Sequence, residues 1–461
     1  MEASLSDLID MSLGSLRQFY KGGANARDVI GHVKARIASR PAANAWIHVA
    51  DDDRLRVATT ELEQRHTAGE ALPLYGVPFA VKDNIDVTGM PTTAACPDFS
   101  YMASRSAASV ERLVRAGAIC IGKTNLDQFA TGLNGTRSPY GPCGSAGNPN
   151  YVSGGSSSGS GVTVGAGHVS FALGTDTGGS GRIPAGFNGI VGIKPTVGRV
   201  SSRGLVPNCP SLDCLSIFCQ TVADGAELLS IIDGFDAADP YSRRTPSGGQ
   251  PDLASAFRFG RLRPDQIECF GMVECASLYE AACQRLERIG GRALDVDFAP
   301  FAEAGQMLFD GPWIAERRAS LEPFATEKSG SLLEVIAQVI VAADRYSAVD
   351  VFAGIRRLQQ LRRRIEGLFA DMDTFVVPTA PRPFTIEAMQ SNPVELNNQL
   401  GYYSYGANLL DLCAVAVPNG VLSCGVPMGV TLLGPAWHDM KLCRLAERFE
   451  RAKESVPGAS A

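Results

Sequence analysis

The spacing of apolar residues predicts alternating helices and strands along this chain. Over residues 4–38 apolar positions recur every three or four residues, as on one face of an amphipathic helix. The largely apolar run 74–85 indicates a buried strand that carries Lys82. A helix is predicted over residues 110–116 and a short strand over residues 118–121.

The region 138–204 is rich in glycine and serine, yet it is too long and too patterned for a linker. Apolar blocks interrupt it at residues 162–164, 169–173 and 190–193. Strand, loop and helix therefore alternate through the central third of the chain, which is the pattern of a layered α/β fold.

A helical segment opens the C-terminal third. Residues 301–370 have a helical pattern with breaks at Gly311-Pro312 and at Pro323, since proline disrupts a helix interior. Three further strands are predicted over residues 374–378, 414–418 and 428–433.

Composition narrows the class of protein. The 461 residues are 45% hydrophobic and 20% charged, an ordinary globular balance that can bury a large core. The net charge of −6 argues against nucleic acid or an anionic membrane as partner, because either favours a basic surface. No apolar run reaches the length of about 18 residues that a membrane span needs. The acidic N-terminus lacks the basic start of a secretory leader, so we expect a cytoplasmic protein.

The twelve cysteines are interpreted as buried free thiols. None forms a CxxC pair, and Cys209, Cys214 and Cys219 recur every five residues with no histidine nearby, which is unlike a zinc site. A chain of this size needs no disulfides to stabilise its core.

The glycine- and serine-rich segment 151–161 has two interpretations that the sequence disfavours. A phosphate-binding loop lacks its motif, because no GxxxxGK[ST] occurs and Val164 stands where GxGxxG needs its last glycine. Residues 155–159 match the GxSxG nucleophile elbow, but a turn precedes them instead of a β-branched strand, and only His168 and His438 follow.

A third interpretation joins this segment to the glycine-rich turn 174–182. Ser180 stands between a predicted strand and a helix that begins near Pro184, a residue suited to the first helical turn. Gly178 and Gly179 let the backbone aim several N–H groups at one point, as an oxyanion hole requires. With so few histidines, a lysine is the candidate base for this serine.

These elements together resemble the amidase signature family. The resemblance rests on Lys82, the run 154–157, the run 174–180 and the continuation through Arg182 to residues 192–196, in the family's order and with its 24-residue interval between two serines. It covers most of the chain and implies one domain over residues 1–461, with a catalytic core at about 70–220 and a helical substrate-side segment at about 301–370. The implied fold is a large mixed β-sheet between α-helices.

The resemblance implies a serine mechanism in which Ser180 is the nucleophile, Ser156 relays the proton and Lys82 is the base. The Gly155–Ser156 peptide bond is expected to be cis. Lys82 must be neutral to act, and its apolar strand favours that form. Asp83 alternates to the opposite strand face, so we do not expect it to hold Lys82 as a cation. A purely structural ion pair is the alternative role for Lys82.

The backbone N–H groups of the nucleophile turn would hold the oxyanion, and neighbouring side chains would support the turn. The expected N–H donors are Thr177, Gly178, Gly179 and Ser180. The expected supporting side chains are Ser157, which orders the serine network, and Asp176 with Arg182, which hold the turn. No metal or cofactor is expected.

Within the family, five segments look like the allophanate hydrolase branch: residues 122–132, 135–141, 180–182, 211–214 and 308–317. The expected substrate contacts are Arg317, Phe309, Thr131 and Gly132, with the Arg317 guanidinium binding a carboxylate through two oxygens. Arg318 is the alternative inward arginine. The implied reaction is hydrolysis of allophanate with release of ammonia.

Two residues depart from that branch. Phe309 replaces a tyrosine whose hydroxyl helps bind the carboxylate, and Gly178 replaces an alanine, which predicts a roomier pocket beside the oxyanion. The chain also stops after the amidase part, so the C-terminal domain of the branch is expected to be absent.

Other hypotheses stay open. A sister amidase could act on another small ureido or amide acid, such as ureidomalonate or biuret. A transamidase component that acts on charged tRNA fits less well with the acidic chain. A non-catalytic scaffold would not need Lys82, Ser156 and Ser180 together. A homodimer is possible.

Overall fold

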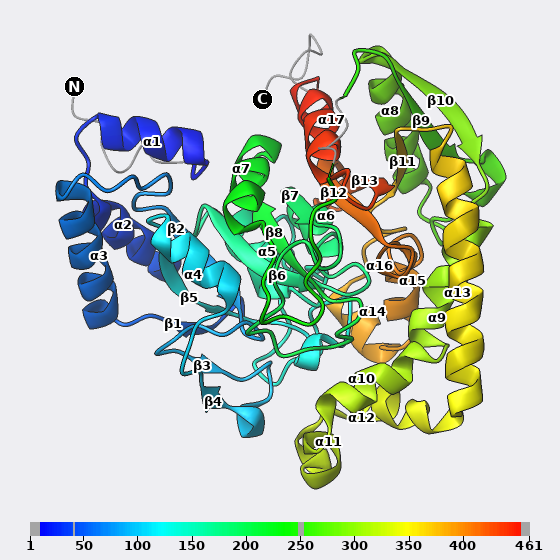
Figure 1. The fold of residues 1–461 in the computed structure, drawn as a ribbon, viewed down its shortest axis with the longest axis horizontal. Helices are drawn as coiled ribbons and strands as arrows, with labels where there is room; N and C mark the ends of the chain where they lie inside the picture. The colour runs from blue at the N-terminus through cyan, green and yellow to red at the C-terminus, as the bar shows by residue number, and fades with distance from the viewer. Residues whose placement is uncertain (1–9, 40–41, 248–252, 453–461) are drawn as a thin grey trace.

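The computed structural model describes residues 10–39, 42–247 and 253–452. Among these residues, eleven strands form one mixed sheet in the order β1-β5-β2-β6-β8-β7-β12-β13-β11-β9-β10, which spans the molecule from side to side (Figure 1). The predicted α/β class with a large mixed sheet is confirmed.

The strands of this sheet are short and mostly buried. In chain order they are β1 (Trp46–Val49), β2 (Pro78–Lys82), β5 (Ile119–Thr124), β6 (Phe171–Asp176), β7 (Val191–Lys194), β8 (Cys214–Cys219), β9 (Phe257–Leu262), β10 (Gly291–Val296), β11 (Thr374–Pro378), β12 (Leu412–Val421) and β13 (Pro427–Pro435). A separate antiparallel pair consists of β3 (Pro91–Thr92) and β4 (Tyr101–Met102).

Helices cover the sheet and extend beyond it. They are α1 (Leu13–Lys21), α2 (Ala26–Ser39), α3 (Asp52–Thr67), α4 (Ala108–Arg115), α5 (Ser158–Gly165), α6 (Ile183–Asn188), α7 (Val222–Ile232), α8 (Val273–Arg288), α9 (Ala299–Phe309), α10 (Trp313–Leu321), α11 (Phe324–Glu327), α12 (Glu334–Val341), α13 (Ala348–Phe369), α14 (Ile386–Ser391), α15 (Glu395–Leu400), α16 (Gly406–Leu409) and α17 (Asp439–Arg451).

Neighbouring residues of β7 show that the sheet has helices on both faces. Gly192 faces α6, where an added Cβ would lie 2.7 Å from the Cβ of Ala185. The next residue, Ile193, contacts Gly225 of α7. Because successive side chains of a strand point to opposite faces, α6 and α7 cover opposite sides of the sheet. α5 packs beside α6, and α17 packs beside α7.

The helical segment predicted over residues 301–370 is confirmed as α9 to α13. It breaks at Gly311-Pro312, between α9 and α10, and at Pro323, between α10 and α11. In Figure 1, α13 runs along the right edge of the molecule and α10 to α12 lie below it. α13 packs against α9, and α9 packs against α16, so this layer is anchored to the body of the protein through α9.

Other boundaries differ from the sequence expectation. The helix expected over residues 4–38 is two helices, because Gly23 adopts a φ of 98° between them, and residues 4–9 lie outside the described part. The strand expected over residues 118–121 continues to Thr124, since β5 pairs in parallel with β2 along that length. The apolar block 162–164 lies in α5.

The thiol interpretation is confirmed, because all twelve cysteines are free and ten of them are buried. No helix in the described ranges is long and apolar enough to cross a membrane.

Candidate active site

Lys82 is the last residue of β2, which lies in the sheet between β5 and β6 and pairs in parallel with both. Its side chain is fully buried, and Nζ donates to Ser156 Oγ and to Thr175 Oγ1, each at 2.8 Å. Burial lowers the pKa of Lys82 to about 7, although the carboxylates of Asp127 and Asp213 partly oppose the shift.

Asp83 is directed away from Lys82, as the strand alternation predicts. Its carboxylate forms an ion pair with Lys123 on β5, with Nζ and Oδ1 2.9 Å apart. No carboxylate in the described ranges forms an ion pair with Lys82, and burial is the main influence on its pKa.

Ser156 and Ser180 come together from two loops. The Gly155–Ser156 peptide bond is cis, as expected. Ser156 Oγ donates to Ser180 Oγ at 2.9 Å, so Lys82, Ser156 and Ser180 form one continuous hydrogen-bonded chain. Ser180 stands in the turn between β6 and α6, and Pro184 lies in the first turn of α6, as the sequence predicts.

The nucleophile turn offers three free backbone donors. The N–H groups of Thr177, Gly178 and Ser180 have no acceptor among the described residues. The N–H of Gly179 instead donates to Asp176 Oδ1 at 2.8 Å. The expectation that Gly179 is an oxyanion donor is therefore corrected, because its hydrogen already has a carboxylate acceptor.

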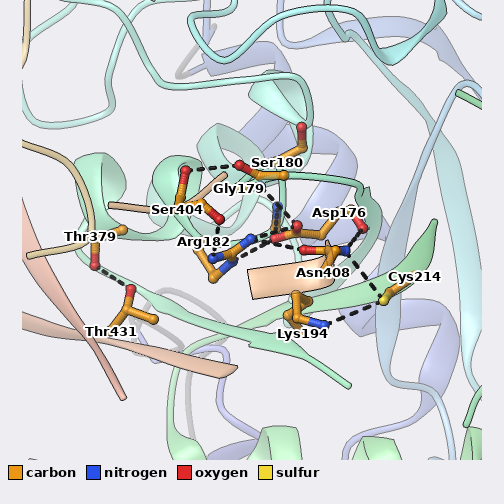
Figure 2. Close-up of polar contacts among 12 residues, drawn as sticks. Asp176, Gly179, Ser180, Arg182, Lys194, Cys214, Thr379, Ser404, Asn408 and Thr431 are labelled. Carbon is orange, nitrogen blue, oxygen red and sulfur yellow. Dashed lines mark hydrogen bonds and ion pairs between the residues drawn. The ribbon is translucent and has the colours of Figure 1, made fainter. Parts of the chain in front are cut away.

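Asp176 and Arg182 hold this turn from below (Figure 2). Arg182 donates to both carboxylate oxygens of Asp176 at 2.9 Å, and the pair is buried. Burial alone would raise the pKa of Asp176, but the charge and hydrogen bonds of Arg182 hold it below its ordinary value. Arg182 also donates to the carbonyl of Ser404, whose hydroxyl donates to the carbonyl of Gly178.

Ser157 is linked to Lys82 through Thr175, a contact of the base that the sequence interpretation missed. Ser157 Oγ donates to the carbonyl of Thr175 at 3.1 Å, and Thr175 Oγ1 contacts Lys82 Nζ. The sequence held one signal for Thr175: it is a polar residue near the end of a strand whose first three residues, 171–173, are apolar.

Thr131 is linked to Arg317 through Asn208, and Gly132 packs against Asp127. The hydroxyl of Thr131 is engaged within the protein, since it donates to the Phe129 carbonyl and accepts from Asn208 Nδ2. A Cβ at Gly132 would lie 2.5 Å from Asp127 Oδ2, so only glycine permits this close approach.

Arg317 on α10 is the inward arginine of its pair. It is 1% exposed, whereas Arg318 lies nearer the surface and pairs with Glu322 and Asp344. The Arg317 guanidinium lies over the Phe309 ring, 4.8 Å from its centre, and Nε donates to Asn208 Oδ1 at 3.1 Å. Its Nη1 is buried and has no hydrogen-bond partner within the described ranges.

The end of α9 joins this arginine to the nucleophile turn. A Cβ on Gly178 would lie 2.5 Å from Leu308 Cδ2 and 3.2 Å from the Tyr405 ring. The rings of Phe309 and Tyr405 are 4.2 Å apart. The expected roomier pocket at Gly178 is therefore absent, because Leu308 fills that space.

Two further polar residues escaped the sequence interpretation. Asn208 holds Arg317, and the buried carboxyl of Asp213 accepts from the hydroxyl of Thr177. Burial raises the pKa of Asp213 to about 6. Asp213 lies in one of the branch-like segments, but nothing local indicated its distant contacts.

Among the described residues, no group of three or more histidine, cysteine, aspartate or glutamate side chains is arranged to hold a metal ion.

Comparisons with known proteins point in one direction. The sequence model of the Amidase family matches residues 28–443. Urea amidolyase of Saccharomyces cerevisiae is 42% identical over 412 residues, which are 89% of this chain and 22% of that protein. One component of the glutamyl-tRNA(Gln) amidotransferase of a Synechococcus strain is 35% identical and aligns over 95% of this chain and 96% of its own length.

Solved structures give the same picture. Allophanate hydrolase of Kluyveromyces lactis superposes with a TM-score of 0.91 at 38% identity, covering 98% of this chain and 74% of that one. The present chain spans only about a fifth of the length of the urea amidolyases of Saccharomyces cerevisiae and Lachancea kluyveri.

Proposed function

Because this chain belongs to the amidase family, whose members hydrolyse carbon–nitrogen bonds, we propose that it cleaves the terminal amide of a small carboxylated urea or amide, foremost allophanate. The observation that carries the proposal is the hydrogen-bonded chain of Lys82 Nζ, Ser156 Oγ and Ser180 Oγ, with links of 2.8 and 2.9 Å. With a pKa of about 7, a large fraction of Lys82 is neutral at neutral pH, as a general base must be.

The proposed reaction uses this chain of groups in both directions. Ser180 Oγ attacks the carbonyl carbon while its proton passes to Ser156, and the proton of Ser156 passes to Lys82 Nζ, since hydroxyl groups both donate and accept. The N–H groups of Thr177, Gly178 and Ser180 stabilise the resulting oxyanion. The C–N bond then breaks, and the proton returns to the leaving nitrogen, which departs as ammonia. Water hydrolyses the Ser180 ester by the same route.

The proposed substrate carboxylate binds at Arg317. This guanidinium is buried over the Phe309 ring, which contacts Tyr405 next to Gly178, and its Nη1 has no hydrogen-bond partner among the described residues. An unsatisfied buried guanidinium N–H is costly, so a carboxylate acceptor would be strongly favoured there. The name of one similar protein, allophanate hydrolase, agrees with such an acid, because allophanate is a carboxylated urea.

The nucleophile is tested with Ser180→Ala. We expect loss of ammonia release and of labelling by a fluorophosphonate probe, with an unchanged thermal unfolding midpoint, because only the attacking oxygen is removed. Undiminished hydrolysis by this variant would rule out the proposed mechanism.

The substrate is tested by measuring ammonia release from allophanate, biuret, malonamate and ureidomalonate. A preference for one of the others over allophanate would indicate the sister amidase.

The carboxylate site is tested with Arg317→Ala on malonamate and its neutral analogue malonamide. Breaking a buried charge-assisted contact costs about 2–5 kcal/mol, so kcat/KM for malonamate should fall well over tenfold. For malonamide, which lacks the carboxylate, kcat/KM should fall only slightly. Arg318→Ala is the matched control and should leave kcat/KM unchanged for both substrates. Equal losses on both substrates in Arg317→Ala would assign this arginine a structural role only.

A second candidate is the transfer of ammonia to charged tRNA, which is favoured by the match with the amidotransferase component along nearly the full length of both chains. The acidic net charge of −6 weighs against a large RNA partner. Formation of amidated glutamyl-tRNA(Gln) by this chain together with partner proteins would favour that candidate.

A cytoplasmic location and a homodimer are further proposals. Cell fractionation tests the location, and light scattering of the purified protein tests the oligomeric state.

A further inference from the structure

The loop formed by residues 208–213, which precedes β8, holds Arg317 through a side chain whose orientation is fixed. Asn208 Nδ2 donates to the Phe129 carbonyl at 2.9 Å and to Thr131 Oγ1 at 3.0 Å. A carbonyl can only accept and the Nε of an arginine can only donate, so the amide oxygen of Asn208 must face Arg317.

The same loop is also hydrogen-bonded to Glu316 of α10, the residue before Arg317. The backbone N–H of Ser211 donates to Glu316 Oε1 at 2.8 Å, and its hydroxyl donates to Glu316 Oε2 at 2.7 Å. Two successive residues of α10 are therefore tied to the 208–213 loop, which limits movement of the arginine relative to that loop.

At its other end the loop reaches the nucleophile turn through Asp213. One carboxylate oxygen, Oδ2, accepts from the backbone N–H groups of Asn208 and Cys209 at 2.8 and 3.1 Å. The other oxygen, Oδ1, accepts from the hydroxyl of Thr177. No arginine or lysine in the described ranges pairs with this buried carboxyl, so these three donors are what hold it in place.

We propose that the 208–213 loop couples the two ends of the site: occupancy of Arg317 by the substrate carboxylate aligns the oxyanion turn at Thr177. This inference rests on the proposed function, since it takes Arg317 as the carboxylate site. Asp213 and Asn208 are positioning residues in this account, because they act through Thr177 and Arg317. The carboxylate then raises kcat as well as affinity, because part of its binding energy is realised only when the turn is aligned for the transition state.

Thr177→Val is the central test, since it removes the hydroxyl that contacts Asp213 while keeping the shape of the side chain and the backbone N–H. We expect kcat for malonamate to fall about tenfold more than kcat for malonamide, the size expected when a hydrogen bond to a charged group is lost. The matched control is Thr196→Val, which removes another buried hydroxyl donated to an aspartate, Asp439, and should leave both kcat values unchanged.

Asn208→Ala tests the other end of the loop. It should raise KM and lower kcat for malonamate, each by severalfold or more, with a smaller change for malonamide. Thermal unfolding and the rate of fluorophosphonate labelling are measured on every variant, so that a folding defect is recognised. Should Asn208→Ala not fold, the isosteric Thr177→Val variant still decides.

The outcomes separate this inference from the proposed function. If the wild type prefers malonamate and Arg317→Ala removes that preference, while Thr177→Val lowers kcat for both substrates by the same factor, the coupling is overturned and the carboxylate site stands. If the wild type shows no preference for malonamate over malonamide, and Arg317→Ala changes the kinetics of neither substrate, both the carboxylate site and the coupling are contradicted.

Discussion

Lys82 differs from an ordinary lysine because its side chain is buried and forms no ion pair with any carboxylate in the part of the chain that the structure describes. Burial therefore lowers its pKa to about 7. A base works only when it is unprotonated, so kcat/KM should rise with pH through about 7 and level off above it. Lys82→Arg should lose about 10²–10⁴-fold in kcat, because a guanidinium does not deprotonate at working pH. Initial rates of ammonia release between pH 5.5 and 9 would check both expectations. A flat pH profile, or an active arginine variant, would contradict the role of Lys82 as base.

The contact between α9 and the nucleophile turn sets the shape of the pocket at the level of elements. Leu308 packs against Gly178 so closely that a methyl group there must displace it. Gly178→Ala should therefore destabilise the fold by about 1–3 kcal/mol, as overpacked core positions do. It should also raise KM, because Phe309 follows on the same helix and supports Arg317. Adding Leu308→Val removes the colliding carbon and should restore much of both losses. Urea unfolding and steady-state kinetics measure the two effects, and a single alanine variant identical to wild type would show that the turn is not confined by α9.

For the molecule as a whole, the buried pair of Asp176 and Arg182 connects parts that are far apart in sequence. Arg182 donates to the carbonyl of Ser404 and to the side chain of Asn408, so it ties the nucleophile turn to the C-terminal part of the chain. Arg182→Met would leave a buried carboxylate uncompensated and should lower the free energy of unfolding by about 3–5 kcal/mol. Arg357→Met, which breaks the exposed pair with Glu303, should cost no more than about 1 kcal/mol. Chemical denaturation compares the variants, and equal losses would mean that the buried pair does not hold these parts together.

Much of this architecture was predictable because its signals are local. The apolar run around Lys82 indicated a buried strand, Pro184 marked the entry of α6, and the breaks of the helical layer fell at prolines. A glycine-rich turn after a strand indicated where Ser180 would lie. Each of these signals depends on the backbone preferences of a few neighbouring residues, which the sequence states directly.

The sequence by itself thus determined the class of fold, the family resemblance and the segments that carry Lys82, Ser156 and Ser180. Only the tertiary structure decided that the N–H of Gly179 faces Asp176, that Leu308 fills the space at Gly178, and that Asn208 meets Arg317 from 109 residues away. The physical reason is that such contacts depend on how α9, α10 and the 208–213 loop pack together. That packing is set by many distant residues at once, and no local pattern of the chain records it.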